Sequence, residues 1–198
     1  MIIGLTGGVA AGKSEALAAF GRLGAATISS DAIVHDLLDC EPLLGRLTER
    51  WGEEIVVDDR VDRGAVGSRV FNDPGELAWL EAQIHPLVRD EISSWAAGLD
   101  AGTEFAVVEV PLLFEGEMAG RFDLTVAITA REETRRERAR SRGQVGIEGR
   151  EGRQLTQSEK AGRADRVIEN DGTPEELEAR LAELMNELRA DRATERPV

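Results

Sequence analysis

The hydrophobic positions at the start of the chain change their spacing within twenty residues. Residues 1–6, Met-Ile-Ile-Gly-Leu-Thr, form the short apolar run that suits a buried parallel strand. Residues 15–20, Glu-Ala-Leu-Ala-Ala-Phe, are good helix formers with apolar positions at helical spacing. The sequence therefore predicts a strand and a helix that are joined by the glycine-rich stretch between them.

The same alternation begins again after Gly24. Residues 25–29 are predicted to form a short strand, and residues 32–38 to form a helix that Ser30 or Asp31 can cap. A second role for Asp31 is equally consistent with the pattern, because the carboxyl edge of an open α/β sheet faces the ligand crevice. A carboxylate at that edge could accept the proton of an attacking hydroxyl. The pattern leaves both roles open.

Helical patterns dominate residues 41–103. The expected elements are helices over 42–51, 63–71 and 76–97, a turn at 72–75 and a short extended segment at 55–61. We interpret this region as a helical insertion that binds the acceptor substrate. It contains His85 directly before Pro86, and a histidine in that position is more typical of packing or of a helix start than of catalysis.

Strand patterns return after residue 103. Strands are predicted over 104–110, 122–129 and 166–170, and helices over 131–142 and 174–189. Glu109 falls near the carboxyl end of the first of these strands, where a carboxylate can orient Mg²⁺ and its waters. The segment Thr173-Pro174-Glu175-Glu176 matches a capping box with proline at the first helical position.

The glycine-rich stretch after the first strand matches the phosphate-binding loop pattern of glycine, four residues and Gly-Lys-Ser. Its glycines allow a tight turn whose amides point into one concavity, and the following helix adds a partial positive charge. We expect Lys13 to reach the β- and γ-phosphates of ATP and Ser14 to offer its hydroxyl to Mg²⁺. The predicted nucleotide-binding residues here are Gly7, Gly8, Val9, Ala10, Ala11, Gly12, Lys13, Ser14 and Glu15.

Composition then narrows the class of protein. The 198 residues suffice for one domain with a hydrophobic core, and the net charge of −14 argues against non-specific binding of nucleic acid. No apolar run is long enough to span a bilayer, and the N-terminus lacks the pattern of a signal peptide. Cys40 is the only cysteine, which favours a cytoplasmic protein without an intrachain disulfide. We expect no membrane partner, and a monomer or weak homo-oligomer.

Arginine is concentrated in residues 131–142 of this acidic chain. This segment contains three glutamates and six arginines, and the arginines are at positions 131, 135, 136, 138, 140 and 142. This surplus predicts a lid that contacts phosphates, although a solvated helix face with Glu–Arg pairs would look similar. Arg138 and Arg142 share one helix face, so both can point at one anion, whereas Arg140 should mostly meet solvent.

Several further motifs occur in order along the chain. They are Gly4-Leu5-Thr6-Gly7-Gly8 before Gly12-Lys13-Ser14, the Asp31 site, His85-Pro86-Leu87, Pro111-Leu112-Leu113-Phe114-Glu115, residues 154–160, and Ala164-Asp165 to Asn170-Asp171-Gly172. Together they resemble the dephospho-coenzyme A kinase family over roughly residues 1–188. The resemblance implies that ATP and Mg²⁺ are used to phosphorylate the ribose 3′-hydroxyl of dephospho-coenzyme A, in the last step of coenzyme A synthesis.

The resemblance also implies a fold and a division of the chain. The fold is an α/β P-loop kinase fold of the nucleoside-monophosphate-kinase type, with three layers and a parallel sheet. The single domain would comprise a core of residues 1–40, 104–130 and 160–190, a helical acceptor-substrate region of residues 41–103 and an arginine-rich lid of residues 131–159.

Roles for single residues follow from the same resemblance. The implied catalytic residues are Asp31 as the base, with Lys13, Arg138 and Arg142 on the transferring phosphate. Arg142 and Asn170 would approach the nucleotide. The implied acceptor-binding residues are Asp31, His85, Leu112, Leu113 and Glu115, and the implied metal-binding residues are Ser14 and Glu109.

The chain departs from the family pattern at a few positions. Ala10 and Ala11 stand where the family usually has Gly-Ser, which preserves the loop amides provided that Ala10 can adopt the local φ and ψ. Ser29 replaces an aspartate before the Asp31 site. Glu15 replaces a threonine, and its carboxylate is unfavourable near phosphates unless it turns outward. Glu109 stands where members often carry aspartate.

Two other functions would also use such a loop. Another small-molecule or nucleotide kinase would share the chemistry and differ in its acceptor. A nucleotide-dependent switch protein would hydrolyse ATP slowly, whatever small acceptor is present. The length of the helical insertion favours a kinase.

Overall fold

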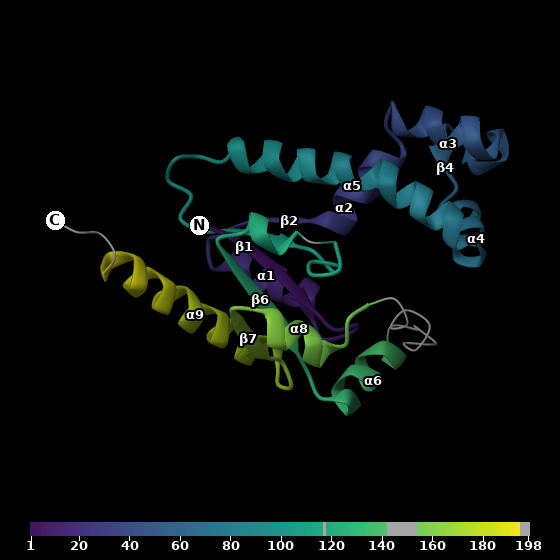
Figure 1. Cartoon of the computed structure of the whole chain (residues 1–198). Coiled ribbons are helices and arrows are strands. Elements are labelled where there is room, and N and C mark those ends of the chain that lie inside the picture. The colour runs from purple at the N-terminus through teal and green to yellow at the C-terminus, as the bar shows by residue number, and fades with distance from the viewer. Residues whose placement is uncertain (117, 142–153, 195–198) are drawn as a thin grey trace. The chain divides into compact units, whose positions relative to one another are not determined.

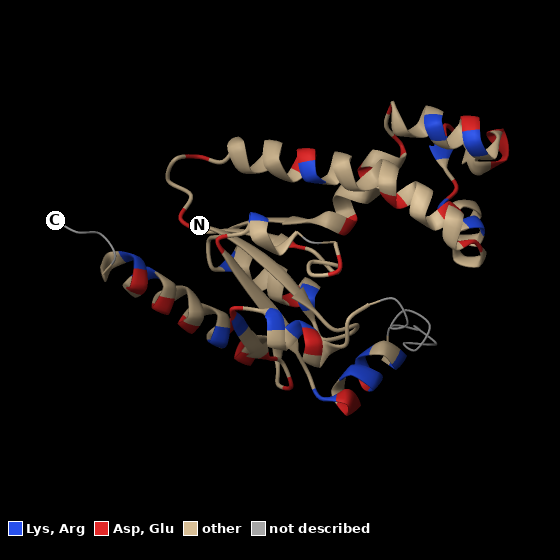
Figure 2. Cartoon of the chain, viewed as in Figure 1, with Lys and Arg blue, Asp and Glu red and all other residues tan. Residues whose placement is uncertain are grey.

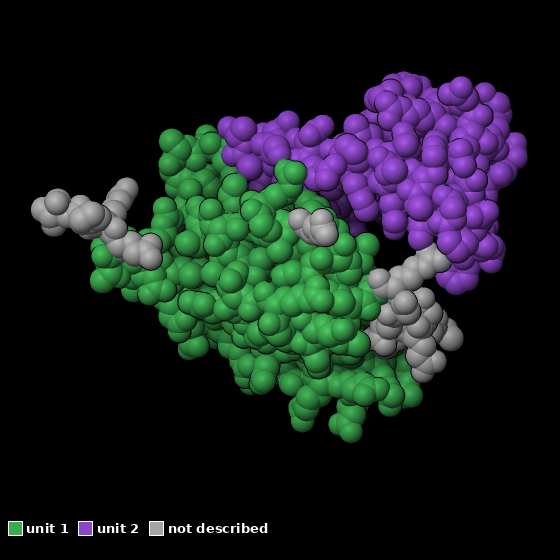
Figure 3. Space-filling model, in the orientation of Figure 1, with its two compact units in different colours: residues 1–28, 99–198 green, residues 29–98 purple. Residues whose placement is uncertain are grey.

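The computed structural model describes residues 1–116, 118–141 and 154–194. The chain forms two compact units, one that contains residues 1–28 together with the chain from Leu99 onward, and one of residues 29–98 (Figure 3). The predicted division into core, acceptor region and lid assigns roles as well as boundaries, and it stays a prediction.

A five-stranded sheet runs through the first unit (Figure 1). Its strands are β1 (Ile2–Gly7), β2 (Ala26–Ser29), β5 (Ala106–Glu109), β6 (Leu124–Thr129) and β7 (Arg166–Glu169), in the spatial order β2-β5-β1-β6-β7. β1 pairs in parallel with β5 and β6, and β6 pairs in parallel with β7. The predicted α/β fold with a parallel sheet is therefore confirmed. Because parallel strands end at a common edge, the segments that follow β1, β5, β6 and β7 begin near one another.

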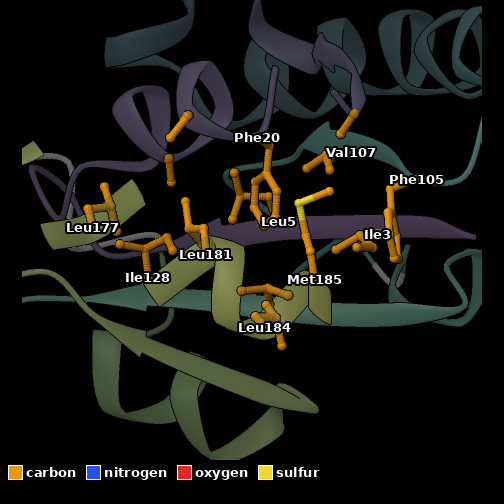
Figure 4. Packing of buried hydrophobic residues seen from close by; sticks show 14 of the residues in the cluster. Ile3, Leu5, Phe20, Phe105, Val107, Ile128, Leu177, Leu181, Leu184 and Met185 are labelled. Atoms are coloured by element: carbon orange, nitrogen blue, oxygen red, sulfur yellow. The ribbon is translucent and has the colours of Figure 1, made fainter. Parts of the chain in front are cut away.

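The core lies between one face of the sheet and two helices, α1 (Lys13–Arg22) and α9 (Pro174–Thr194). Ile3 and Leu5 lie on one face of β1 and pack against Phe20 of α1 and against Leu181 and Met185 of α9 (Figure 4). Burial of such side chains contributes about 1.5–3 kcal/mol each. The loop between Gly7 and Lys13 is thus held at both ends by elements that pack in the core.

The opposite face of the sheet is covered by α8 (Gln157–Arg163) and by the segment that follows β5. Thr6, whose side chain points away from Leu5, donates its hydroxyl to Pro111 O at 3.3 Å. Lys160 of α8 donates its ammonium to the same carbonyl at 2.6 Å. Helices therefore cover both faces, which gives the three predicted layers.

The second unit is largely helical. Its elements are α2 (Ser30–Leu38), α3 (Leu43–Trp51), the 3₁₀ helix η1 (Glu53–Ile55), β3 (Val56–Val57), β4 (Arg60–Val61), α4 (Arg63–Asn72) and α5 (Pro74–Ala97). Helices α2 and α4 both pack on α5. The predicted helices and the turn are confirmed within a few residues, and the extended segment is the antiparallel pair β3–β4.

One local prediction in this unit is wrong. α2 begins at Ser30, and its N-cap is the extended residue Ser29, whose side chain makes no capping hydrogen bond. Ser30 and Asp31 are therefore the first residues of the helix rather than its cap. His85 lies in the middle of α5, inside the helix predicted over 76–97, so of the two structural alternatives a helix start does not apply. The helix continues through Pro86 because Leu80, Ile84, Val88 and Ile92 form one buried stripe along it, and this packing outweighs the lost hydrogen bond.

The remaining predicted helices are present with different ends, whereas α8 was not predicted from the pattern. Helix α6 is Glu132–Ser141, and a short 3₁₀ helix, η2 (Ala119–Arg121), precedes β6. The predicted capping box is confirmed, since Glu176 N donates to Thr173 Oγ1 at 3.3 Å and Thr173 N donates to Glu176 Oε2 at 2.9 Å. α9 extends to Thr194, beyond the predicted end at Arg189, because Leu184, Met185 and Leu188 pack into the core. No helix in the described ranges is long and apolar enough to cross a membrane.

Candidate active site

The loop between β1 and α1 leaves the carboxyl edge of the sheet through three residues with positive φ. Gly7 has a φ of 151°, Ala10 of 59° and Gly12 of 100°. Gly12 is required twice over, because its left-handed backbone favours glycine and because a Cβ there would collide with the side-chain amide of Asn170. The glycines predicted from the motif therefore occupy positions that other residues could not fill without strain.

Most backbone amides of the loop make no hydrogen bond within the described part of the chain. Of the five amides from Gly8 to Gly12, only Ala11 N–H donates to an acceptor in the described part of the chain, to Gly8 O at 3.2 Å. Gly8 and Gly12 are nevertheless buried. Buried amides without partners are rare in proteins, and a run of them around a concavity is the arrangement that binds anions. The geometry therefore supports a phosphate-binding cradle.

Lys13 and Ser14 begin the helix that follows this cradle. The Lys13 ammonium donates to Gly7 O at 3.3 Å and to Gly8 O at 3.1 Å, which holds a positive charge beside the loop. Ser14 lies in the first turn of α1 and is exposed, so its hydroxyl is accessible. Charge and helix dipole act in the same direction here, because the N-terminus of a helix also attracts anions.

Glu109 is the candidate carboxylate next to the loop. It ends β5, it aligns with Leu5 of the neighbouring β1, and only 6% of it is exposed. The predicted position at the carboxyl end of a strand is therefore the position found. Among the described residues there is no group of three or more histidine, cysteine, aspartate or glutamate side chains that could hold a metal ion. A cation at this edge would depend on few protein ligands.

Arg138 and Asn170 meet the loop from two other elements. Asn170 follows β7, is 4% exposed, and donates Nδ2–H to Ala11 O at 2.8 Å. Arg138, on α6, donates to Asn170 O at 2.9 Å and to Ala11 O at 3.4 Å. The structure thus brings these two predicted residues together with the loop. Arg142 lies outside the described residues.

The segment Pro111–Glu115 is held by a buried lysine. The Lys160 side chain is fully buried, and its ammonium lies 3.2 Å from Glu115 Oε1, which also accepts Leu155 N–H at 2.8 Å. The other oxygen, Glu115 Oε2, is buried and has no hydrogen-bond partner among the residues that the structure describes. Leu113 is fully buried and Leu112 partly buried, so Leu113 offers a substrate no side-chain surface. Substrate binding by these three residues stays a prediction.

Asp31 and His85 belong to the second unit. Asp31 is exposed in the first turn of α2, two residues beyond the end of β2, and makes no hydrogen bond within the described ranges. His85 is exposed on α5, the helix against which α2 packs. A carboxylate with accessible oxygens is able to accept a proton, which agrees with the predicted role of Asp31 as a base.

Comparison with known proteins decides the family. A model of the family described as dephospho-CoA kinase matches residues 1–176. The dephospho-CoA kinase of Anaeromyxobacter dehalogenans is 37% identical over 202 residues, which cover 99% of this chain and 96% of that protein. The chain belongs to the dephospho-CoA kinase family. The enzyme of the same name from Thermobifida fusca is 33% identical, over 94% of this chain and 95% of that protein.

Solved structures agree with membership of the dephospho-CoA kinase family. The crystal structure of TT1252 from Thermus thermophilus has a TM-score of 0.80 at 36% identity and covers 95% of this chain and 97% of its own. The dephospho-CoA kinase from Campylobacter jejuni has a TM-score of 0.73 at 25% identity, over 96% of this chain and 98% of its own. A shikimate kinase from Acinetobacter baumannii, at 15% identity and a TM-score of 0.52, shares the fold.

The departures from the dephospho-CoA kinase pattern are accommodated locally. Ala10 adopts the left-handed conformation, which costs an alanine about 1–2 kcal/mol, so the loop keeps its path. The carboxylate of Glu15 accepts a hydrogen bond from Arg22 Nη2 at 2.9 Å near the other end of α1. It is therefore turned along the helix, and only the backbone of Glu15 remains a candidate for nucleotide binding.

Two residues next to the loop were missed by the sequence analysis. Arg135 donates Nε–H to Val9 O at 2.8 Å. Gln157, the first residue of α8, exchanges hydrogen bonds with both backbone groups of Ala130, at 2.9 and 3.0 Å, and lies against Gly8. A signal existed for Arg135, because it precedes Arg138 by three residues and so shares its helix face. Gln157 lies within the motif of residues 154–160, but no feature of the sequence singled it out within that motif.

Proposed function

We propose that this protein transfers the γ-phosphate of ATP to the ribose 3′-hydroxyl of dephospho-coenzyme A and so completes coenzyme A synthesis. Membership of the dephospho-CoA kinase family supports the reaction. The single structural observation that carries the proposal is the loop of residues 7–14. Within the described ranges the amides of Gly8 and Gly12 have no acceptor, and the end of the loop carries the Lys13 ammonium.

Lys13 has the central role in the transfer step. Phosphoryl transfer needs positioned reactants and neutralisation of the charge on the transferring group, with little covalent chemistry by the protein. The loop amides bind phosphate oxygens that are already charged in the ground state. The Lys13 ammonium is only partly buried, so it would exchange the carbonyls of Gly7 and Gly8 for the β- and γ-phosphates.

Ser14 and Glu109 fit a magnesium ion. The donor set consists of an accessible hydroxyl and a carboxylate at the same sheet edge, and hard oxygen ligands are those that Mg²⁺ prefers. The small number of protein ligands also fits Mg²⁺, which keeps several waters and relies on substrate phosphates. When bound, the ion would neutralise charge on the β- and γ-phosphates. Ser14 and Glu109 would hold it or its waters in place.

Asp31 is the proposed base for the acceptor hydroxyl. Its carboxylate is exposed and carries no hydrogen bond within the described ranges that would have to break first. It would orient the ribose 3′-hydroxyl and accept its proton as the bond to phosphorus forms. His85, Leu112 and Glu115 are proposed to contact the acceptor substrate.

We further propose a cytoplasmic enzyme of small molecules that acts as a monomer or weak homo-oligomer. A single cysteine among 198 residues supports a reducing compartment, and the net charge of −14 disfavours nucleic acid as a partner.

The test is a reaction with purified protein, ATP, Mg²⁺ and dephospho-coenzyme A, followed by mass spectrometry. The expected product is heavier by one phosphoryl group, located on the ribose. Parallel reactions with nucleosides and nucleoside monophosphates as acceptors should give no comparable product. If ATP is hydrolysed slowly and at the same rate whatever acceptor is present, the protein is a nucleotide-dependent switch and not a kinase.

A further inference from the structure

We propose that Arg138, Asn170 and Arg135 are positioning residues that set the direction of the loop amides by binding the loop carbonyls. The proposal concerns the phosphate cradle and rests on the proposed function only in so far as this cradle is the ATP site. It gives Arg138 a role other than the direct phosphate contact expected from the sequence.

The carbonyl of Ala11 is held by two side chains. Asn170 Nδ2 donates to it at 2.8 Å, and Arg138 Nη1 approaches it at 3.4 Å. The two side chains are themselves connected, because Arg138 Nη1 donates to Asn170 O at 2.9 Å and Nη2 donates to Asn170 Oδ1 at 3.4 Å. Arg138 Nη2 also lies 3.4 Å from Gly172 O. The guanidinium is therefore engaged with backbone and amide oxygens on both of its terminal nitrogens.

The carbonyl of Val9 is held in the same manner by Arg135, whose Nε donates to it at 2.8 Å. Arg135 and Arg138 are three residues apart on α6, so one helix face supplies donors to two carbonyls of the loop. Lys13 donates hydrogen bonds to the carbonyls of Gly7 and Gly8, and Gly12 O accepts a hydrogen bond from the Ala16 amide at 3.0 Å. Five carbonyls between Gly7 and Gly12 thus have donors.

Fixing a carbonyl also fixes the next amide. In a trans peptide unit, the C=O of one residue and the N–H of the next point in opposite directions. When Asn170 and Arg138 hold Ala11 O, the N–H of Gly12 is turned to the other side. When Arg135 holds Val9 O, the same applies to the N–H of Ala10. Neither amide has an acceptor within the described ranges, so both are directed into the cradle and available to an anion.

A carboxylate keeps α6 and the Asn170 turn together. Asp171 Oδ1 accepts the Arg131 amide at 2.7 Å and the Thr134 hydroxyl at 3.0 Å, at the start of α6. The backbone hydrogen bond from Arg131 is the main reason why the pKa of Asp171 lies below its usual value. Asp171 directly follows Asn170, so the two donors to Ala11 O are tied to one another through the backbone as well.

The experiment uses inorganic tripolyphosphate, which presents phosphates to the cradle without adenine or ribose. Its affinity is measured by calorimetry on the whole protein and on four variants: Arg138→Ala, Asn170→Ala, Asn170→Asp and the double alanine variant. Asn170→Asp retains an oxygen for Arg138 but cannot donate to Ala11 O, and it adds a negative charge near the anion, so the hydrogen bond itself is judged from Asn170→Ala and the added charge from the difference between the two variants. The matched control is Arg140→Ala, on the exposed side of the same helix.

We expect each single variant to bind tripolyphosphate about 5- to 30-fold more weakly, in the lower part of the loss that follows when one hydrogen bond at a buried acceptor is removed. The double variant should lose little more affinity for tripolyphosphate than whichever single alanine variant binds more weakly, because both side chains act on Ala11 O. In the kinase assay KM for ATP should rise while KM for dephospho-coenzyme A stays unchanged. Arg140→Ala should match the unmodified protein.

A loss of 100-fold or more in Arg138→Ala together with normal binding in both Asn170 variants would overturn the proposal and make Arg138 a direct phosphate ligand. Additive losses in the double variant would overturn it too. If the alanine variants fail to fold by circular dichroism, Arg135→Lys and Arg135→Ala test the same idea at Val9 O. Tripolyphosphate binding with the expected pattern, but without phosphorylation of dephospho-coenzyme A, would reject the proposed function and leave this inference standing.

Discussion

The two lysines of the chain, Lys13 and Lys160, are both placed by carbonyl oxygens. Lys160 is fully buried, and its charge is compensated by Glu115 and by Pro111 O at 2.6 Å. Lys13 is only partly buried, and its two carbonyl partners lie in the loop itself. A buried charge must keep its partners, whereas a partly exposed one can exchange them for a ligand. The first arrangement is structural, and the second suits a residue that acts on phosphate.

Lys13→Ala should lower turnover by about 10²–10³, the usual loss when one well-placed electrostatic contact to a transition state is removed. The fold should be unaffected, because the Lys13 side chain is only partly buried and donates to carbonyls of the loop rather than to the core. Steady-state kinetics with ATP and dephospho-coenzyme A measure the effect. Glu15→Ala is the matched control, since that carboxylate is turned towards Arg22. A Lys13→Ala variant with normal turnover would contradict the assignment of the loop.

Asp31→Asn should lower turnover by about 10²–10⁴, the range for general acid–base catalysis, because an amide cannot accept the proton of the hydroxyl. KM for ATP should change little. The control is Asp36→Asn, which changes another exposed carboxylate of α2. Equal and small effects of the two substitutions would mean that Asp31 merely carries charge at the start of a helix.

The substitutions Ala10→Gly and Ala11→Gly should change the free energy of unfolding in opposite directions. Ala10 has a φ of 59°, so Ala10→Gly relieves left-handed strain and should raise the free energy of unfolding by about 0.5–1 kcal/mol. Ala11 is fully buried and lacks a positive φ, so Ala11→Gly should lower it by about 0.5–1 kcal/mol through added chain entropy and lost packing. Urea unfolding measures both. A stabilised Ala11→Gly would show that the loop path differs from the one described.

At the scale of elements, the arginine-rich helix α6 carries its arginines on two faces, and the phosphate contact predicted for the helix stays a prediction. The basic run stands out on this helix in Figure 2. Arg135 and Arg138 face the loop and bind its carbonyls, whereas Arg136 pairs with Glu132 one turn away and Arg140 is exposed. The excess of arginine over glutamate therefore reflects one inward face and one solvated face of the same helix.

Helix α3 is clamped onto α5 by a different arginine. Arg50 donates to both oxygens of Glu76, at 2.7 and 2.9 Å, and Trp51 Nε1 donates to Glu76 Oε2 at 2.7 Å. The guanidinium also lies 4.5 Å from the centre of the Trp79 ring, which Trp51 meets edge-on. The hydrogen bonds from Arg50 and then Trp51 hold the pKa of Glu76 below its usual value.

This clamp should make stability depend on pH through Glu76. Since the folded pKa lies below the unfolded one, the contribution is complete above the unfolded value near 4.5 and is lost as pH falls through the folded value. Glu76→Gln should therefore lower the thermal midpoint at pH 7 and flatten its decline on acidification below pH 5. Glu49→Gln, an exposed substitution on α3, is the control. Parallel acid profiles for all three proteins would contradict the role of Glu76.

At the scale of the whole molecule, the candidate residues divide between the two units. The loop, Glu109, Arg138 and Asn170 belong to the unit that contains the sheet, and Asp31 and His85 to the helical unit. The proposed acceptor residues are themselves divided, because Leu112 and Glu115 lie in the unit that contains the sheet while Asp31 and His85 lie in the helical unit. The residues proposed for ATP and those proposed for the acceptor can be tested separately, through KM for ATP and KM for dephospho-coenzyme A.

The sequence by itself determined the features that depend on neighbouring residues. Strand β1, the loop and α1 were readable because an apolar run, a glycine pattern and a helical spacing follow one another within twenty residues. The capping box at Thr173 was readable for the same reason. The motifs in their order along the chain also pointed to the family that the comparisons show. Each of these signals is local, so no knowledge of the rest of the fold was needed.

Tertiary structure decided what depends on residues far apart. The placement of β5 between β1 and β2, which brings Glu109 beside the loop, follows from strand pairing that no local pattern encodes. Packing of a buried stripe carries α5 through Pro86, against the local preference of proline. Arg135, Arg138 and Asn170 reach loop carbonyls 126 to 159 residues away in the chain. Backbone carbonyls are the same in every residue, so a sequence cannot show which of them a distant side chain will find, and only the folded chain selects the partner.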